Sequence, residues 1–240
     1  MLPKIELPIY EINLPSTGKK IKIRPFVVKE EKLLLMSLES NDDDYIIETT
    51  KQIINNCVID KIDIEELPFF DIDYIFISLR AKSVGESIAV KFTCNSPSNT
   101  GICGHEFTAN IDISNSKIIK NEDIKPEVKV YNVTIKLKYP SYDTIKKLNN
   151  NEEISIFDNR IKLISECIDM VVDGDSVQTR KDFTPEELVE FVENLPQEHF
   201  KKLERFVDNF PSFVVTAKAK CPTCKTTHNI EYSEFESFFV

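Results

Sequence analysis

Four cysteines form two pairs whose spacings suit a metal ion. Cys94 and Cys103 are separated by eight residues in the middle of the chain, and Cys221 and Cys224 form a Cys-x-x-Cys motif near its end. Four thiolates in tetrahedral arrangement are a common ligand set for structural zinc. The longer first spacing contains serine, proline, asparagine and glycine, which can fold back as a loop. The sequence therefore predicts one zinc ion bound by all four cysteines.

Each cysteine pair lies between two stretches in which apolar and polar residues alternate. The two regions are residues 86–113 and 212–233. Such alternation is typical of β-strands with one buried face, and a turn between two strands places the intervening residues at the tip of a hairpin. We therefore expect two cysteine-bearing hairpins that close one zinc-ribbon-like site and join the middle of the chain to its C-terminal part.

Other roles for these cysteines stay open at this point. The first residues of the chain are charged and interrupted by prolines, which is not the pattern of a secretory signal peptide. In a reducing compartment a Cys-x-x-Cys motif favours metal or redox chemistry over a structural disulfide. A thioredoxin-like motif should open a helix, whereas the residues after Cys224 alternate like a strand. Reduced thiols without a ligand, and two disulfides, are the remaining alternatives.

Two histidines and two further cysteines lie outside the predicted ligand set. His105 and His228 are close enough in the sequence to replace a thiolate, but we interpret each as a strand residue beyond its hairpin tip. Cys57 and Cys167 lie on apolar faces of predicted helices, where a cysteine is best interpreted as a small core residue. A site closed by four thiolates has no open position for water or substrate, so it is expected to be structural.

No motif in the sequence indicates an enzyme. A zinc deaminase requires His-x-Glu followed by Pro-Cys-x-x-Cys, but here His105 and Glu106 are adjacent and Lys220 precedes Cys221. The sequence also has no glycine-rich phosphate-binding loop, and its three histidines are dispersed, so no nucleophile–base pair can be assembled. We expect no catalytic residues, no cofactor besides zinc and no small-molecule substrate.

Composition argues against nucleic acid and membrane as partners. The chain of 240 residues has 30 Lys and Arg against 40 Asp and Glu, a formal net charge of −10. Binding to nucleic acid needs clustered cations that face phosphates, and no run approaches the roughly 18 apolar residues of a membrane span. The length is sufficient for one large or two modest domains with real cores.

The whole pattern predicts an α+β fold with β-hairpins and several amphipathic helices. A first hairpin is expected around the turn at residues 15–19, and a strand or hairpin edge at 128–140. The expected helices cover residues 27–40, 45–58, 71–86, 141–150, 152–172, 182–196 and 197–211, and residues 113–127 are expected to be a loop. Two domains follow from this pattern: residues 1–85, and residues 86–240, in which the cysteine hairpins enclose a helical segment at 141–210.

Local signals fix some details of these helices. Thr184 is the expected N-cap of one helix, with Pro185 at its first position and Glu187 placed to complete a capping box. The acidic run before residue 45 is a second start signal, because carboxylates accept hydrogen bonds from free N–H groups and complement the helix dipole. Charged residues at 29–32 are interpreted as a solvated face, and Asp71 as part of an acidic cap.

Three phenylalanines near the C-terminus form an apolar patch. They are Phe235, Phe238 and Phe239. A terminal run this aromatic is expected to dock against the protein's own core or against a partner.

With these stretches placed, the chain resembles a family of virion-assembly proteins. It is similar over nearly its full length to the baseplate hub subunit or hub assembly proteins of T-even-type contractile-tailed bacteriophages (myoviruses). The resemblance rests on the order and spacing of residues 14–40, of residues 79–94 and of residues 210–240. The paired-cysteine pattern carries over at all four positions, although Lys225 stands where such a knuckle commonly has glycine.

The resemblance implies a non-enzymatic structural or assembly protein of the tail baseplate hub. Its expected partners are other hub or tail proteins, and its expected location is the virion tail baseplate, or the host cytoplasm during assembly. The alternative is a zinc-ribbon regulatory or nucleic-acid-processing protein. The net charge weighs against that alternative, because the basic residues near the cysteines, Lys218, Lys220 and Lys225, are few and lie close to acidic segments.

Overall fold

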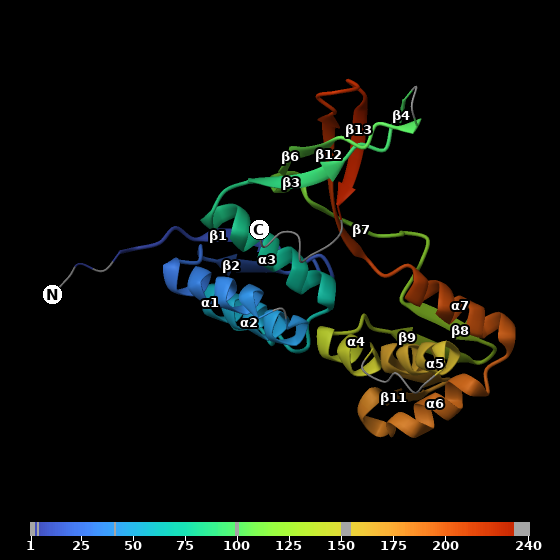
Figure 1. The fold of residues 1–240 in the computed structure, drawn as a ribbon. Helices are drawn as coiled ribbons and strands as arrows, with labels where there is room; N and C mark the ends of the chain where they lie inside the picture. Colours follow the sequence, from blue (N-terminus) through green and yellow to red (C-terminus); the bar gives the residue numbers. More distant parts are fainter. Residues whose placement is uncertain (1–2, 4, 41, 99–100, 150–154, 233–240) are drawn as a thin grey trace. The chain divides into compact units, whose positions relative to one another are not determined.

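The chain folds into two compact units. The computed structural model describes residues 3, 5–40, 42–98, 101–149 and 155–232. The first unit comprises residues 1–64, 70–119 and 212–240, and the second comprises residues 65–69 and 120–211. Across the described residues there are seven α-helices and five small sheets, all antiparallel (Figure 1). The mixed α and β composition is therefore confirmed, whereas the expected division at residue 85 stays a prediction.

The first unit opens with the predicted hairpin and three helices. Strands β1 (Tyr10–Asn13) and β2 (Lys20–Ile23) pair around a turn in which Gly18 has a φ of +71°. The helices are α1 (Val28–Glu39), α2 (Asp43–Cys57) and α3 (Phe69–Ser83). Asp42 caps α2, since its carboxylate accepts from the Tyr45 N–H at 3.1 Å. The predicted start of this helix is confirmed.

The third helix starts earlier than the sequence indicated. It begins at Phe69, so Asp71 lies inside its first turn instead of serving as its cap. The Asp71 side chain is fully buried and accepts a hydrogen bond from the Ser16 backbone N–H at 2.9 Å. The interpretation of Asp71 as a cap was wrong, because its carboxylate is used to hold the β1–β2 turn.

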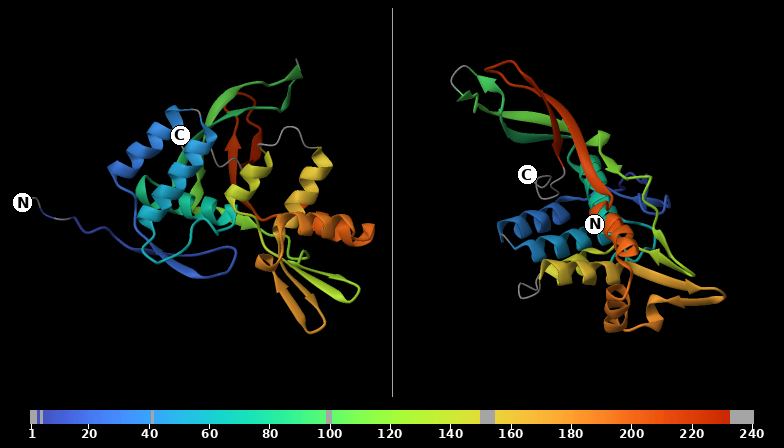
Figure 2. Two further views of the ribbon diagram at one scale, coloured as in Figure 1. Left: turned by 90° about the horizontal axis from the view of Figure 1, so that it is seen from below. Right: turned by 90° about the vertical axis from the view of Figure 1, so that its right-hand side faces the viewer.

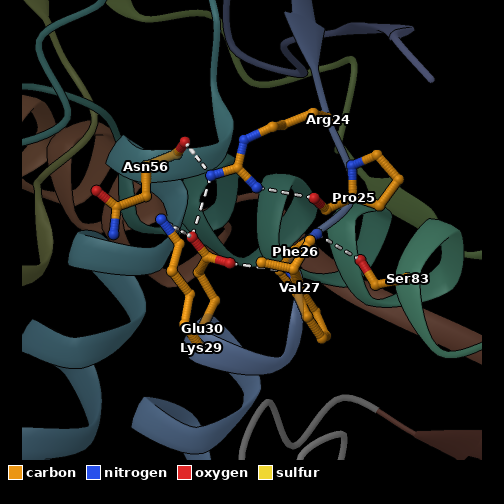
Figure 3. Close-up of polar contacts among 8 residues, drawn as sticks. All are labelled: Arg24, Pro25, Phe26, Val27, Lys29, Glu30, Asn56 and Ser83. Carbon is orange, nitrogen blue, oxygen red and sulfur yellow. Dashed lines mark hydrogen bonds and ion pairs between the residues drawn. The ribbon is translucent and has the colours of Figure 1, made fainter. Parts of the chain in front are cut away.

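The interpretation of the charged residues of α1 as a solvated face was also wrong in one respect. Glu30 is fully buried, with an exposed fraction of 0%. It accepts from the Arg24 guanidinium at 3.0 Å and from the Val27 N–H at 2.9 Å, and it lies 3.3 Å from the Lys29 ammonium (Figure 3). Arg24, which is half-buried, also donates to the carbonyl of Asn56, so this ion pair connects α1 to α2.

The pKa of Glu30 reflects this environment. Burial by itself raises the pKa of a carboxyl group, because it disfavours the charged form. The hydrogen bond from Val27 and the two cations outweigh burial, and the net effect is a lowered pKa for Glu30. The carboxylate is therefore ionised inside the core of the first unit.

The remaining strands of the first unit form the cysteine hairpins. Strands β3 (Ser87–Thr93) and β6 (Glu106–Asp112) pair in one hairpin, and β12 (Ser212–Lys220) and β13 (Thr227–Tyr232) pair in the other. The two hairpins run alongside each other toward their tips (Figure 2). Four short segments connect these strands. The loop between β3 and β6 contains β4 (Pro97–Ser98) and β5 (Gly101–Ile102), and β6 is followed by the 3-10 helix η1 (Ile113–Asn115) and by β7 (Lys117–Ile119).

The expected loop at residues 113–127 was partly wrong. Its first residues form η1, and β7 then pairs antiparallel with the start of β12, with Ile119 opposite Ser212. The sheet order is β13-β12-β7. Because the partner strand lies so far along the chain, the local pattern could not indicate this pairing.

The second unit packs helices against a four-stranded sheet. The sheet order is β11-β10-β9-β8. Its elements in chain order are β8 (Glu127–Val130), β9 (Val133–Leu137), α4 (Tyr142–Asn149), α5 (Ile156–Cys167), β10 (Ile168–Asp173), β11 (Ser176–Thr179), η2 (Arg180–Asp182), α6 (Pro185–Glu193) and α7 (Gln197–Asp208). Its core combines Ile135, Cys167, Leu188, Leu203 and Phe206.

The structure confirms one helix boundary here and corrects another. Thr184 accepts from the Glu187 N–H at 3.2 Å and Glu187 accepts from the Thr184 N–H at 2.7 Å, which is the predicted capping box of α6. The single helix expected at residues 152–172, by contrast, ends at Cys167 and continues as strand β10. Among the residues that the structure describes, no helix is long and apolar enough to cross a membrane.

Candidate metal centre

The four cysteines of the two hairpins meet at one point in the first unit. The Sγ atoms of Cys94, Cys103, Cys221 and Cys224 all lie within 4.8 Å of one another. Cys94 and Cys224 are 3.5 Å apart, and Cys103 and Cys221 are 4.0 Å apart. A zinc ion with four Zn–S bonds of about 2.3 Å places its sulfur atoms about 3.8 Å apart. The cluster is therefore close enough to bind a metal ion.

The two cysteine loops share one backbone pattern. In the first loop Cys94 donates its N–H to the carbonyl of His105 at 2.9 Å, and Gly104 donates to the carbonyl of Cys94 at 2.9 Å. In the second loop the same two bonds join Cys221 to Thr226 and Lys225 to Cys221. Their lengths are 2.9 and 3.0 Å. Each loop thus turns its two thiols to the same side of its hairpin.

The unusual length of the first loop has a local explanation. Cys103 donates its N–H to the carbonyl of Ser96 at 2.8 Å, and Pro97 pairs with Ile102 in the two-residue strands β4 and β5. The extra residues therefore leave the cysteine loop as a small side hairpin. The backbone hydrogen bonds of Cys94 and Gly104 close the cysteine loop at the base of this side hairpin. The first loop, with eight residues between its cysteines, therefore has the same backbone hydrogen bonds as the second loop, which has two.

The residue after the second cysteine adopts a left-handed conformation in both loops. Gly104 and Lys225 each have a φ of +63°. Glycine takes this conformation without steric strain, whereas other residues do so less readily. Lys225, which stands where such a knuckle commonly has glycine, keeps the same backbone φ as Gly104. Its side chain also donates to the carbonyl of Pro222 at 2.7 Å.

A histidine lies closer to the sulfur atoms than the sequence suggested. His228 belongs to β13, as predicted, but its Nε2 is 3.2 Å from the Sγ of Cys94 and 3.2 Å from the Oγ of Ser96. Its ring packs on Phe92 with a centroid distance of 5.1 Å. The signal in the sequence was its place four residues after Cys224. His105 instead stacks on Phe107, with ring centroids 6.5 Å apart.

The thiols of the cluster differ in acidity. Hydrogen bonds from the Thr226 side chain and backbone lower the pKa of Cys224 to about 5. At Cys103 a backbone hydrogen bond with His105 lowers the pKa of the thiol. Burial and the neighbouring cysteines have the larger combined effect, and the pKa of Cys103 is raised to about 11. The pKa values of these two thiols are therefore shifted in opposite directions. A cation would favour the thiolate form at every position.

The other two cysteines lie elsewhere in buried positions. Cys57 ends α2 and Cys167 ends α5, and each has an exposed fraction of 0%. Burial raises the pKa of Cys57 to about 11 and that of Cys167 to about 12. Both are core residues, as predicted, and neither belongs to the cluster. The predicted contact residues Phe235, Phe238 and Phe239 lie outside the residues that the structure describes.

Comparison with known proteins assigns the chain to a family. The model of the family described as T4 bacteriophage base plate protein matches residues 7–240. The chain therefore belongs to the T4 bacteriophage base plate protein family, and its place is the virion tail baseplate, together with other baseplate proteins. The comparison found no match to a curated protein or to a solved structure.

Proposed function

We propose that this protein is a non-enzymatic structural or assembly component of the baseplate hub. In this proposal one zinc ion, bound by Cys94, Cys103, Cys221 and Cys224, stabilises its first unit. The observation that carries the proposal is the approach of four sulfur atoms from two hairpins to within 4.8 Å. Family membership supports the baseplate role, and the hub is the part of the baseplate that the sequence resemblance indicates.

Zinc has a specific structural task in this arrangement. The β3–β6 and β12–β13 hairpins belong to separate sheets and are not joined to each other by strand pairing. The β3–β6 hairpin is a two-stranded sheet, which by itself is marginally stable in water, whereas β7 extends β12 and β13 to three strands. Structural zinc contributes about 10–16 kcal/mol of apparent binding free energy in small domains. A metal ion at the tips would therefore fix the weaker hairpin to the three-stranded sheet.

The four-thiolate set also explains why the site would not be catalytic. Four protein ligands leave no open position on a tetrahedral zinc ion. His228 would then serve as a neighbour that donates a hydrogen bond to the Cys94 sulfur, since its Nε2 lies at 3.2 Å. Such donors orient the ligands and lower the charge density on sulfur.

Metal analysis tests the zinc assignment. Protein purified without added zinc should contain one zinc ion per chain by plasma mass spectrometry. Cys221→Ser should lose the ion, whereas Cys57→Ser and Cys167→Ser should retain it. The assignment would be refuted by metal-free wild-type protein that is folded and whose hairpins resist proteolysis as well as those of zinc-loaded protein.

Complementation in infected cells tests the hub role. A phage with a nonsense mutation in this gene should make tails that lack a complete hub, and the wild-type protein supplied in trans should restore them. Cys221→Ser should fail to restore them and Cys57→Ser should succeed. Complete hubs in the absence of the protein would contradict the role.

A further inference from the structure

We propose that the outer edge of β8 in the second unit binds an extended acidic segment of a partner protein, which adds to the sheet as a fifth strand. The proposal concerns a surface that the metal centre does not include. Only the identification of the partner as a baseplate protein rests on the proposed function.

The first argument is the free backbone of β8. In the hairpin with β9, Val130 pairs with Val133 and Val128 pairs with Ile135. The Leu137 N–H donates to the Pro126 carbonyl at 2.9 Å, which fixes the alternation of bonded pairs. Residues between bonded pairs direct their N–H and C=O groups to the opposite side. The backbone groups of Glu127 and Lys129 therefore point outward.

No strand covers this side in the part of the chain that the structure describes. β8 is the last strand of the order β11-β10-β9-β8. Exposed edges of this kind are where an extended peptide can add by main-chain hydrogen bonds. Two outward-facing residues supply two donors and two acceptors for such a strand.

The second argument is a hollow of about 600 Å³ along the same edge. The hollow is lined by Val128, whose side chain faces the core, and by Glu127 and Lys129, whose side chains face solvent. Side chains from both faces of β8 therefore border it. A hollow bordered by both faces of a strand follows the strand's edge. Its other side is α7, which runs beside β8 (Figure 1) and contributes Lys202 and Arg205.

The third argument is charge. Four cations line the hollow, namely Lys125, Lys129, Lys202 and Arg205, against two carboxylates, those of Asp123 and Glu127. All four cations are exposed. The Lys202 ammonium lies 3.4 Å from Nδ1 of His199, and none of the four cations forms an ion pair with a carboxylate of the described residues. The cations lie on both sides of the edge, so acidic residues on either face of an added strand would meet one. This local excess of positive charge stands on a chain of net charge −10.

These features favour a polypeptide over a nucleic acid. Backbone pairing with Glu127 and Lys129 requires alternating amide groups, which nucleic acids lack. An extended segment with several aspartates or glutamates satisfies both the edge and the charges.

Binding of a synthetic peptide tests the proposal on the full-length protein. The probe is an eight-residue peptide of alternating glutamate and valine, with an alternating lysine–valine peptide and a fully N-methylated glutamate–valine peptide as controls. The acidic peptide should bind at up to about 1 mM, and neither control should bind. In nuclear magnetic resonance the amide hydrogens of Glu127 and Lys129 should become protected from exchange. Those of Val128 and Val130, already bonded to β9, should be unchanged.

Charge reversal provides the matched comparison. The double variant Lys202→Glu with Arg205→Glu should bind the peptide at least about tenfold more weakly, since two attractions become two repulsions. The variant Lys201→Glu with Lys181→Glu changes the charge equally at exposed residues outside the hollow and should bind like the wild type. Equal weakening by the two double variants would overturn the proposal.

Other occupants of the edge would give different results, each of which overturns the proposal. Protection of Glu127 and Lys129 that rises with protein concentration alone would assign the edge to a second copy. Protection in the free protein that disappears on deletion of residues 235–240 would assign it to the chain's own terminus. Tighter binding of a single-stranded oligonucleotide than of the acidic peptide would assign it to nucleic acid. Absence of peptide binding at 1 mM would exclude an acidic strand.

Discussion

Gly104 and Lys225 are equivalent residues in the two cysteine loops. Each follows the second cysteine of its loop, each has a φ of +63°, and each donates its N–H to the carbonyl of the first cysteine. A chain with two copies of one turn thus uses glycine in one copy and lysine in the other. The lysine copy holds the strained backbone, because a Cβ atom is disfavoured in this conformation.

Exchange of these residues should change stability in opposite directions. Lys225→Gly should raise the free energy of unfolding of the zinc-loaded protein by about 0.5–1 kcal/mol, because strain is relieved but the unfolded chain gains freedom. Gly104→Ala should lower it by about 1 kcal/mol. A Cβ at Gly104 meets only the Ile102 carbonyl, at 3.9 Å, so the effect is one of backbone conformation. Urea unfolding at fixed free zinc measures both; a loss of stability in Lys225→Gly would contradict the account.

The ion pair between the buried Glu30 and the half-buried Arg24 should contribute to stability near neutral pH. Glu30→Gln should lower the free energy of unfolding by about 2 kcal/mol at pH 7, because the half-buried Arg24 charge loses its counter-ion. The exposed pair between Lys20 and Glu11 offers a matched control. Glu11→Gln should cost less than about 0.5 kcal/mol. Equal effects of the two substitutions in urea titrations would show that burial of Glu30 is unimportant.

The same pair predicts a pH dependence with a defined sign. The pKa of Glu30 is lowered below its ordinary value of 4.5 in the folded state. Its contribution is therefore fully present above pH 4.5 and is lost as the pH falls through the folded pKa. The stability difference between wild type and Glu30→Gln should shrink as the pH falls below 4.5. A difference that stays constant from pH 7 to pH 3 would contradict the lowered pKa.

Thiol reactivity should follow the acidity of the cysteines. In metal-free protein at pH 6.5, iodoacetamide should modify Cys224 first, because its pKa of about 5 leaves it ionised. Cys57 and Cys167, with pKa values of about 11 and 12, should react only on unfolding. Peptide mass spectrometry identifies the order, and Thr226→Val should slow the modification of Cys224. Faster reaction at Cys103 than at Cys224 would reverse the assignment.

The aromatic C-terminus stays a candidate contact for a hub protein. Deletion of residues 235–240 should leave the melting temperature within a few degrees of the wild type and should abolish binding to its hub partner. Each phenylalanine ring offers about 150–250 Å² of buryable surface. Calorimetry and co-purification measure the two effects. A sharp fall in stability with partner binding retained would assign the rings to the protein's own core.

Elements whose signals are local could be predicted from the sequence. The capping box at Thr184 and Glu187, the N-cap at Asp42 and the hairpin strands around the cysteines depend on neighbours within a few residues. The four cysteines could be placed together because two hairpin tips can share one metal ion. Thiolates are metal ligands, and one loop carries a Cys-x-x-Cys motif. These two facts were sufficient to predict that Cys94 and Cys221 lie together although more than 100 residues separate them.

Elements that depend on distant partners could not be predicted. Ile164, Cys167, Ile168 and Val171 fit one apolar helix face, yet the chain leaves the helix after Cys167 because Ile168 pairs with Leu137 of β9. The burial of Glu30 depends on Arg24 and Asn56, which come from other elements. The approach of His228 to Cys94 depends on how the two hairpins pack against each other.

The pairing of Ile119 with Ser212 makes the second unit an insertion between two neighbouring strands of the first. The ribosome releases the first hairpin, with Cys94 and Cys103, long before β12 and β13 exist. Residues 120–211 emerge meanwhile, and domains generally fold as units during synthesis. The cysteine cluster can close only after Cys224 has emerged, when residues 120–211 of the second unit have already been made. Chains that end before Cys224 would therefore lack the closed cluster even if their second unit is folded.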